Sequence, residues 1–432
     1  MKWPFSRKGL PHFDEHISRA IGWFYNTWVD NETGTGWGHF AGLERVTEWG
    51  GTLEGIRALV RVGENKNDHR IAKAISWLKS VQQQDGGWKS WEIRESCVEP
   101  TAWALITLRL CDESLDSKCF KKGIGFLIKA TNVTEEHCYW GAYEGADPRV
   151  YPTLLAIWAL SGIRDDLSAK GAKWLKASRN SDGGWGFRPN DEISNIAMTA
   201  MAVYVLLTTK QLFMGEMLEK TLGWIRSHLR NDGTWPAAIE DWISCLDPDT
   251  KDKIPAQTKH FSTAWALMAL IKANVPISDP KLSNSLAVLA KMQEENGSWI
   301  FSRDDPKEYS WCVANAMWAL ADACDAFYSP VGFTSYVENI VSKSLRRATY
   351  MSIINLSLII LTIFGGILYL SGAYQGLLDS LAGFVAWLSG LVASIARELV
   401  IAIIATAVIS STIAIYRWLK KRQTRREEKT HE

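Results

Sequence analysis

Two kinds of helical segment alternate along the first three quarters of the chain. One kind is apolar on a single side: residues 68–83 place Ile71, Ile75, Leu78 and Val81 at steps of three and four, the spacing of an amphipathic helix. An Asp-Gly-Gly turn follows this segment, and we expect it to end the helix because glycine adopts the left-handed conformation that a helix end requires. The other kind of segment is apolar on nearly all sides.

The first kind belongs to a phrase that occurs six times, a helix end followed by a turn and a Trp. The clearest copies are W-L-K-S-V-Q-Q-Q-D-G-G-W at 77–88 and W-L-K-A-S-R-N-S-D-G-G-W at 174–185. The closing residues are separated by 51, 52, 45, 50 and 64 positions, and they are Trp37, Trp88, Trp140, Trp185, Trp235 and Trp299. A period near fifty predicts a repeat architecture. We expect each closing Trp to fold back and cover the helix end.

The second kind of segment follows a loop in every repeat. These segments cover residues 51–60, 100–108, 152–160, 194–207, 262–270 and 310–320. Helices that are apolar on all sides are buried ones, so their amphipathic partners must lie outside them. Six buried and six outer helices that alternate along the chain predict an all-α fold, an (α/α)6 toroid barrel that occupies residues 1–328.

Composition places this barrel in a reducing compartment and away from nucleic acid. The formal net charge is only +1, and none of the seven Cys residues forms a C-x-x-C motif, so we expect no nucleic-acid partner and a reduced, cytosolic barrel. The first thirty residues hold several charges and no apolar run, so no signal peptide is expected.

The C-terminal part of the chain predicts a membrane anchor. Residues 350–371 and 399–416 are uncharged and close to the roughly 20 residues that a membrane-spanning helix needs. After a linker at 329–348, we expect these two spans to form a transmembrane hairpin within 349–418, with residues 377–396 as an interfacial helix. Because 377–396 is apolar enough to cross, three spans remain the alternative.

The basic residues predict how this anchor is oriented. Residues 331–432 hold 11 Lys and Arg against 6 Asp and Glu, while residues 1–330 hold 37 against 41. Basic clusters precede the first span and fill the tail at 419–432, and such clusters mark the cytoplasmic side. We therefore expect the protein at the inner, cytoplasmic membrane with its barrel in the cytoplasm.

The D-G-G-W turns and the T-A-W-A-L helix openings resemble the repeats of squalene-hopene cyclase, related terpene cyclases and the β subunits of protein prenyltransferases. The resemblance covers roughly residues 14–325. It implies QW-like helix-pair repeats and an apolar isoprenoid or polyprenyl lipid as ligand. It also implies that the alkene-protonating acid lies in a D-x-D-D motif before T-A, and no D-x-D-D occurs in this chain. In C-V-E-P-T-A, Glu99 falls on the middle Asp of that motif.

Glu99 is therefore the first candidate for the catalytic acid. Pro100 suits the first helical position, which would place Glu99 at the helix cap, where the positive end of the helix dipole favours the anion. Glu99 could donate a proton only if it were buried and protonated. The alternative is a plain capping carboxylate at the surface. Glu48 and Glu192 occupy similar positions in other repeats and are the further catalytic candidates.

A zinc site is the alternative that the prenyltransferase resemblance implies. Its ligands would be Asp241, Cys245 and His260, but the Asp and Cys are four positions apart where that family has two. Ligand geometry rather than ligand type decides such sites. We therefore expect no metal and no other cofactor.

The buried segments supply aromatic residues that could bind an isoprenoid. Aromatic ring faces attract cations, including carbocations, although residues at helical spacing also serve as core. The candidates for substrate binding are Trp103, Trp158, Tyr204, Trp265, Trp311 and Trp318. The fifth repeat carries an insertion between Trp235 and Ser262, which we expect to be a loop over the mouth of the barrel.

Together these features predict a membrane-anchored, terpene cyclase-like or prenyltransferase-like barrel that acts on or binds an isoprenoid or polyprenyl lipid. Two alternatives stay open, a non-catalytic barrel that binds lipid or protein and a carbohydrate-active enzyme of the same barrel type. Two carboxylates that face each other across a wide polar cleft would favour the carbohydrate-active enzyme.

Overall fold

The computed structural model describes residues 13–90, 95–211, 214–246 and 253–328, with the side chains of 241–257 left out of the description. Helices of two kinds alternate along this part of the chain. The outer, amphipathic helices are α1 (Phe13–Asn26), α3 (His69–Ser80), α5 (Lys118–Lys129), α7 (Asp165–Ala177), α9 (Glu216–Ser227) and α11 (Pro280–Lys291). The inner helices are α2 (Leu53–Arg61), α4 (Val98–Leu110), α6 (Val150–Leu160), α8 (Ile196–Thr208), α10 (Ser262–Lys272) and α12 (Ser310–Tyr328).

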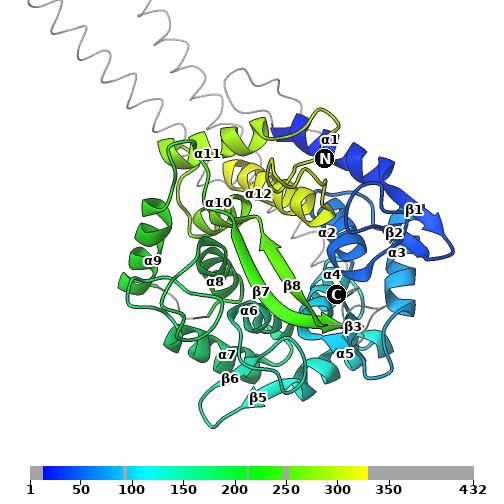
Figure 1. Cartoon of the computed structure of the whole chain (residues 1–432), viewed down its shortest axis with the longest axis horizontal. Helices are drawn as coiled ribbons and strands as arrows, with labels where there is room; N and C mark the ends of the chain where they lie inside the picture. The colour runs from blue at the N-terminus through cyan, green and yellow to red at the C-terminus, as the bar shows by residue number, and fades with distance from the viewer. Residues whose placement is uncertain (1–12, 91–94, 212–213, 247–252, 329–432) are drawn as a thin grey trace, which may run out of the picture. The chain divides into compact units, whose positions relative to one another are not determined.

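The inner helices form a closed ring inside the outer ones. Each inner helix packs against the next along the chain, and α12 packs against α2, so the ring closes. Figure 1 shows the outer helices arranged around this ring in chain order. Every residue of α6 and nearly every residue of α4, α8 and α10 is buried, as expected for helices with apolar residues on all sides. The predicted repeat of outer and inner helices is therefore confirmed within the described residues.

The closing Trp of each repeat seals the end of the preceding outer helix. In Trp88, for example, the indole Nε1 donates a hydrogen bond of 2.8 Å to the carbonyl of Leu78 in α3. The same bond occurs in all six repeats, with lengths from 2.6 to 2.8 Å, at Trp37, Trp88, Trp140, Trp185, Trp235 and Trp299. These rings are almost completely buried. Each Trp thus satisfies a helix-end carbonyl that would otherwise lack a partner.

A threonine in the next inner helix holds the backbone of the same Trp. The Oγ1 of Thr101 in α4 accepts a hydrogen bond of 2.9 Å from the backbone N–H of Trp88. Five repeats share this contact, with Thr52, Thr101, Thr153, Thr199 and Thr263 as acceptors. The turn before Trp88 needs glycine, because Gly86 has φ +95° and a Cβ there would meet the carbonyl oxygen of Lys122 at 2.3 Å.

Four short antiparallel hairpins connect the helices of the described chain: β1–β2 (Trp28–Asn31, Gly34–Trp37), β3–β4 (Trp88–Lys89, Ser96–Cys97), β5–β6 (Thr131–Val133, Cys138–Trp140) and β7–β8 (Ala238–Leu246, Lys253–His260). The last lies in the insertion of the fifth repeat, which the sequence predicted as a loop, and that prediction is wrong. The strands pair from Ala238↔His260 to Leu246↔Lys253. Figure 1 shows this hairpin drawn across the middle of the ring.

Two ion pairs hold the base of the β7–β8 hairpin. Glu240 of β7 pairs with Arg149, which directly precedes α6, and Lys259 of β8 pairs with Asp305 in the loop before α12. Because β8 runs into α10, the hairpin lies at the end of the ring where the inner helices begin. The insertion is thus in the predicted place over the mouth.

The predicted linker (329–348), the two spans (350–371 and 399–416), the interfacial helix (377–396) and the basic tail (419–432) lie outside the described residues. In the part of the chain that the structure covers, no helix is long and apolar enough to cross a membrane.

The Trp contacts predict that two Trp residues of one repeat contribute very differently to the stability of the protein. Trp185 is fully buried, whereas Trp174 on α7 is partly exposed and packs against Tyr139. We expect Trp185→Ala to lower the free energy of unfolding by about 3–5 kcal/mol, since it leaves a core cavity, and Trp174→Ala to lower it by less than half as much. Urea denaturation followed by circular dichroism measures both, and equal losses would contradict this role of the closing Trp.

Candidate functional site

A cavity of about 540 Å³ lies inside the ring, at the end where the inner helices begin. Its wall comes from the first two turns of α2, α4, α6, α10 and α12, from the segment between β2 and α2, from the β8 strand and from the loop before α12. The lining residues are His39, Phe40, Trp49, Glu54, Arg57, Glu99, Trp103, Tyr151, Thr258, Lys259, His260, Trp265, Lys307, Tyr309, Trp311 and Asn315. The cavity therefore combines aromatic rings with several ionisable groups.

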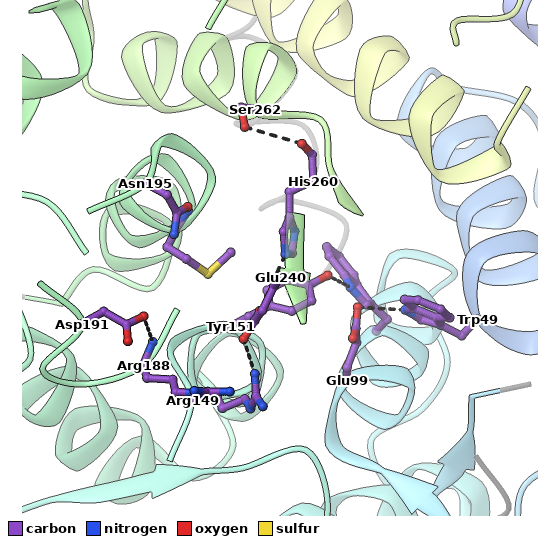
Figure 2. A network of polar contacts seen from close by, with 12 residues as sticks. Trp49, Glu99, Arg149, Tyr151, Arg188, Asp191, Asn195, Glu240, His260 and Ser262 are labelled. Carbon is purple, nitrogen blue, oxygen red and sulfur yellow. Dashed lines mark hydrogen bonds and ion pairs between the residues drawn. The ribbon is translucent and has the colours of Figure 1, made fainter. Parts of the chain in front are cut away.

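Glu99 is the most strongly perturbed carboxyl group in this wall. Its side chain is 1% exposed, and its Oε1 accepts a hydrogen bond of 2.8 Å from the indole Nε1 of Trp49 (Figure 2). The other oxygen, Oε2, has no hydrogen-bond partner among the described residues. Burial raises the pKa of Glu99 to about 8, although hydrogen bonds from Tyr151 and Trp49 oppose the rise. Glu99 therefore holds a proton at neutral pH.

The sequence-based placement of Glu99 was wrong in two respects. Helix α4 begins at Val98, so Pro100 is the third residue of the helix and Glu99 the second. Glu99 is also neither a surface carboxylate nor the helix cap, because the residue before the helix is Cys97. Burial outweighs the favourable helix dipole, which explains why the acid stays protonated.

A chain of hydrogen bonds leads from Trp103 to Glu99. The indole Nε1 of Trp103 donates to the hydroxyl of Tyr151 at 3.1 Å, and that hydroxyl in turn bonds to Glu99. Burial raises the pKa of Tyr151 well above its usual value. This hydroxyl therefore stays protonated and can donate a hydrogen bond. Trp49 and Tyr151 are thus positioned to stabilise Glu99 when it is a carboxylate.

Helix α2 brings a second carboxyl group and a guanidinium into the same wall. The Nη2 of Arg57 lies 3.9 Å from Oε1 of Glu54 and donates to Oδ1 of Asn315 at 3.1 Å. The guanidinium carbon also lies 3.8 Å from the centre of the Trp103 ring. Sequence reasoning missed this group because residues 51–60 were treated as apolar. Two charged residues three positions apart in a buried helix were the available signal.

The predicted aromatic residues divide into two groups. Trp103, Trp265 and Trp311 line the cavity. Trp158, Tyr204 and Trp318 are not in its wall, and they pack edge to face, with ring centres of Trp158 at 5.5 Å from Tyr204 and 6.1 Å from Trp318. This second group fills the ring further along the inner helices, so the cavity ends there.

Of the other predicted acids, neither Glu48 nor Glu192 lines the cavity. Glu192 is exposed in the bend before α8 and is not among the residues that line the cavity. Glu48 lies beside the cavity residue Trp49 and is partly exposed, and burial raises its pKa. Only Glu99 of the three predicted acids is placed at the cavity.

His260 lies in the cavity wall, but the described residues give it no metal partners. Its ring is 4% exposed and packs edge to face on Tyr151, with ring centres 4.9 Å apart. The side chains of Asp241 and Cys245 on β7 lie outside the description, and no group of three or more His, Cys, Asp or Glu that could hold a metal occurs among the described residues. Of the three residues of the zinc alternative, the structure describes the side chain of His260 alone.

The fold and the site together define the class of this protein: a closed ring of six helix pairs that encloses a cavity with aromatic walls and buried carboxyl groups. The family model of the squalene-hopene cyclase C-terminal domain matches residues 5–146 and 191–305, and the chain belongs to this family. The resemblance expected from the repeats is thereby confirmed.

Individual relatives match shorter stretches. The squalene-hopene cyclases of Bradyrhizobium diazoefficiens and Zymomonas mobilis are 32% and 34% identical over 136 residues, which are 27% of this chain and 20% of each cyclase. The chain thus spans about a fifth of the length of these relatives. A structure of a protein from Actinoplanes has a TM-score of 0.52 at 17% identity and covers 72% of this chain and 99% of that one, which shows a shared fold.

The protonated state of Glu99 predicts a particular pH dependence of stability. The unfolded chain loses the Glu99 proton near the ordinary value of 4.5, while the folded chain keeps it to about 8. The contribution of Glu99 to stability is therefore fully present below pH 4.5 and is lost as the pH rises towards 8. We expect Glu99→Gln to flatten this decline, as measured by urea denaturation across the pH range.

The exposed Glu192 supplies the matched control. Glu192→Gln should leave the pH profile of the free energy of unfolding as it is in the wild type. Identical profiles for the wild type and Glu99→Gln would mean that Glu99 is ionised in the folded protein at neutral pH.

Proposed function

We propose that the protein is an isoprenoid cyclase whose reaction begins when Glu99 protonates a carbon–carbon double bond. The observation that supports it is the unpartnered Oε2 of a buried, protonated Glu99 in the wall of a cavity lined by Trp103, Trp265 and Trp311. Membership of the squalene-hopene cyclase family supports the same ligand class.

The residues of the site suit each step of such a reaction. The proton moves from Oε2 of Glu99 to one alkene carbon, and the neighbouring carbon becomes a cation. The aromatic ring of Trp265 in the cavity wall attracts that cation, and a second double bond of the same molecule closes the ring by attacking it. The cyclic cation then loses a proton to give the neutral product, so one proton is added and one is released, and the overall reaction is an isomerisation that needs no cofactor.

The acid must satisfy two opposing requirements. It has to be protonated at neutral pH, which burial of Glu99 ensures, and it has to release its proton to a weakly basic alkene. The hydrogen bonds from Trp49 and Tyr151 favour the carboxylate and lower the pKa that burial alone would produce.

The carbohydrate-active alternative fits the site less well. A glycosidase needs one protonated and one ionised carboxyl group, with pKa values that the environment drives apart. Glu54 and Glu99 both line the cavity, and burial raises the pKa of both. The environment therefore shifts the two pKa values in the same direction instead of driving them apart.

The C-terminal part of the chain supports a proposed location at the membrane. Residues 350–371 and 399–416 would anchor the barrel at the cytoplasmic face of the inner membrane, where an isoprenoid substrate is dissolved in the bilayer. Such an anchor would keep the cavity close to its source of ligand. This part of the proposal rests on the hydropathy and charge of the sequence.

Removing the acid should abolish turnover and leave binding intact. We expect Glu99→Gln to lower the rate of product formation from squalene or other isoprenoids by at least about 10²–10⁴-fold, the usual contribution of a general acid. Gas chromatography with mass spectrometry of the products measures this. Glu192→Gln, outside the cavity, should react like the wild type.

If the wild type and Glu99→Gln both bind isoprenoids tightly and neither converts any, the alternative of a non-catalytic lipid-binding barrel is correct. If Glu99→Gln converts them at the rate of the wild type, Glu99 is not the acid.

The proposed anchor predicts how the chain fractionates. The full chain should stay with membranes after extraction with alkaline carbonate, whereas residues 1–332, which form one compact unit, should appear in the supernatant. Immunoblotting of both fractions provides the measurement. Recovery of the full chain in the carbonate supernatant would argue against the membrane spans.

A further inference from the structure

Three polar residues in the cavity wall have no part in the protonation step. Glu54 and Arg57 come from α2 and Asn315 comes from α12, and they are 2%, 3% and 7% exposed. The Nη2 of Arg57 bonds to Asn315 and lies near Glu54, so the three side chains form one group. We call it the α2–α12 polar group.

Two atoms of this group are buried without a hydrogen-bond partner in the described part of the chain, Nε of Arg57 and Oε2 of Glu54. An unsatisfied buried polar atom costs about 1–3 kcal/mol, and more where the group is charged. A pure hydrocarbon in the cavity would leave both atoms in this state. A ligand that carries an oxygen atom at the end facing Arg57 and Glu54 could form hydrogen bonds with both of these atoms.

The charges of the cavity indicate a neutral oxygen group. Arg57 lies 3.9 Å from Glu54 and opposes its charge, and Lys259 at the same cavity is paired with Asp305. A phosphate or carboxylate bound at the α2–α12 polar group would therefore lie beside the Glu54 carboxyl group, while the third cation of the wall, Lys307, is exposed and belongs to the loop before α12. A hydroxyl group is uncharged, and it can both accept from the Nε–H of Arg57 and donate to Oε2 of Glu54.

We propose that the cavity binds an isoprenoid alcohol, whose hydroxyl group is held by the α2–α12 polar group while its hydrocarbon chain lies against the aromatic wall. The guanidinium of Arg57 is stacked 3.8 Å from the ring centre of Trp103, which fixes its position in the wall. This inference takes the isoprenoid chain from the proposed function and adds the chemical class of the substrate.

An anchored hydroxyl would also select the double bond that reacts. Glu99 lies on α4, the neighbour of α2 in the ring, and both line the same cavity. When one end of a chain is held by Arg57 and Glu54, the distance along the chain to Glu99 is fixed. Holding a reactant in one register is a large part of enzymatic rate enhancement.

Binding to the wild-type full chain tests this directly. Trp49, Trp103, Trp265 and Trp311 line the cavity, so quenching of tryptophan fluorescence reports occupancy. The probes are geranylgeraniol, its methyl ether, geranylgeranyl diphosphate and squalene. We expect geranylgeraniol to bind at least about 100-fold more tightly than squalene and about tenfold more tightly than the ether, which cannot donate to Glu54. Equal affinities, or tightest binding of the diphosphate, would overturn the proposal.

Variants locate the hydroxyl. Glu54→Gln and Arg57→Gln should each weaken binding of geranylgeraniol by about tenfold to 100-fold and leave squalene unchanged. Arg226→Gln, on the outer helix α9 and outside the cavity, is the matched control and should change neither. Should Arg57→Gln fail to fold, binding of the probes to the wild type and to Glu54→Gln still tests the proposal. Parallel losses for both ligands in Glu54→Gln would overturn the proposal.

The outcomes separate this inference from the proposed function. If geranylgeraniol binds tightly through Glu54 and Arg57 but no product forms, the cyclase proposal fails and the alcohol site stands. If products form while alcohol and hydrocarbon bind alike in the wild type and in Glu54→Gln, the alcohol site fails and the cyclase proposal stands.

Discussion

The structure depends on one repeated contact, the Trp that links an outer helix to the next inner helix. The indole N–H of Trp88 binds the last turn of α3, at Leu78, and the backbone N–H of the same residue binds Thr101 at the start of α4. A single residue therefore fixes two successive helices relative to each other. Because the contact recurs around the ring, the starts of the inner helices are held at one level, and side chains from distant parts of the sequence meet there.

The cavity is a consequence of this arrangement. Glu99, Tyr151 and Glu54 all lie in the first turns of inner helices, so a ring that aligns these turns brings them into one wall. The aromatic group around Trp158 closes the ring further along. The same burial that stabilises the ring raises the pKa of Glu99 and leaves Arg57 without its full set of hydrogen bonds. Stability and reactivity at this site thus have a common origin.

The repeats could be predicted from sequence because a Trp at a fixed distance from a helix end and an apolar helix are local signals. Glu99 could be singled out by its place before T-A, but its protonation depends on burial within the assembled ring, which the hydrogen bonds of Trp49 and Tyr151 from neighbouring repeats oppose. Glu192 also precedes an inner helix in the sequence, but it lies in the bend before Ile196, where α8 begins, and is exposed. The pairing of β7 with β8 and the role of Arg57 likewise depend on contacts between distant segments.

The central claim is that this ring encloses a site for an oxygen-bearing isoprenoid. Mass spectrometry of the lipids that co-purify with the full chain, compared between the wild type and Glu54→Gln, tests it most directly. The account predicts an isoprenoid alcohol, or a cyclised product that keeps its hydroxyl group, in the wild type and less of it in the variant. Recovery of a sugar, a phosphorylated lipid or only a hydrocarbon from the wild-type protein would contradict it.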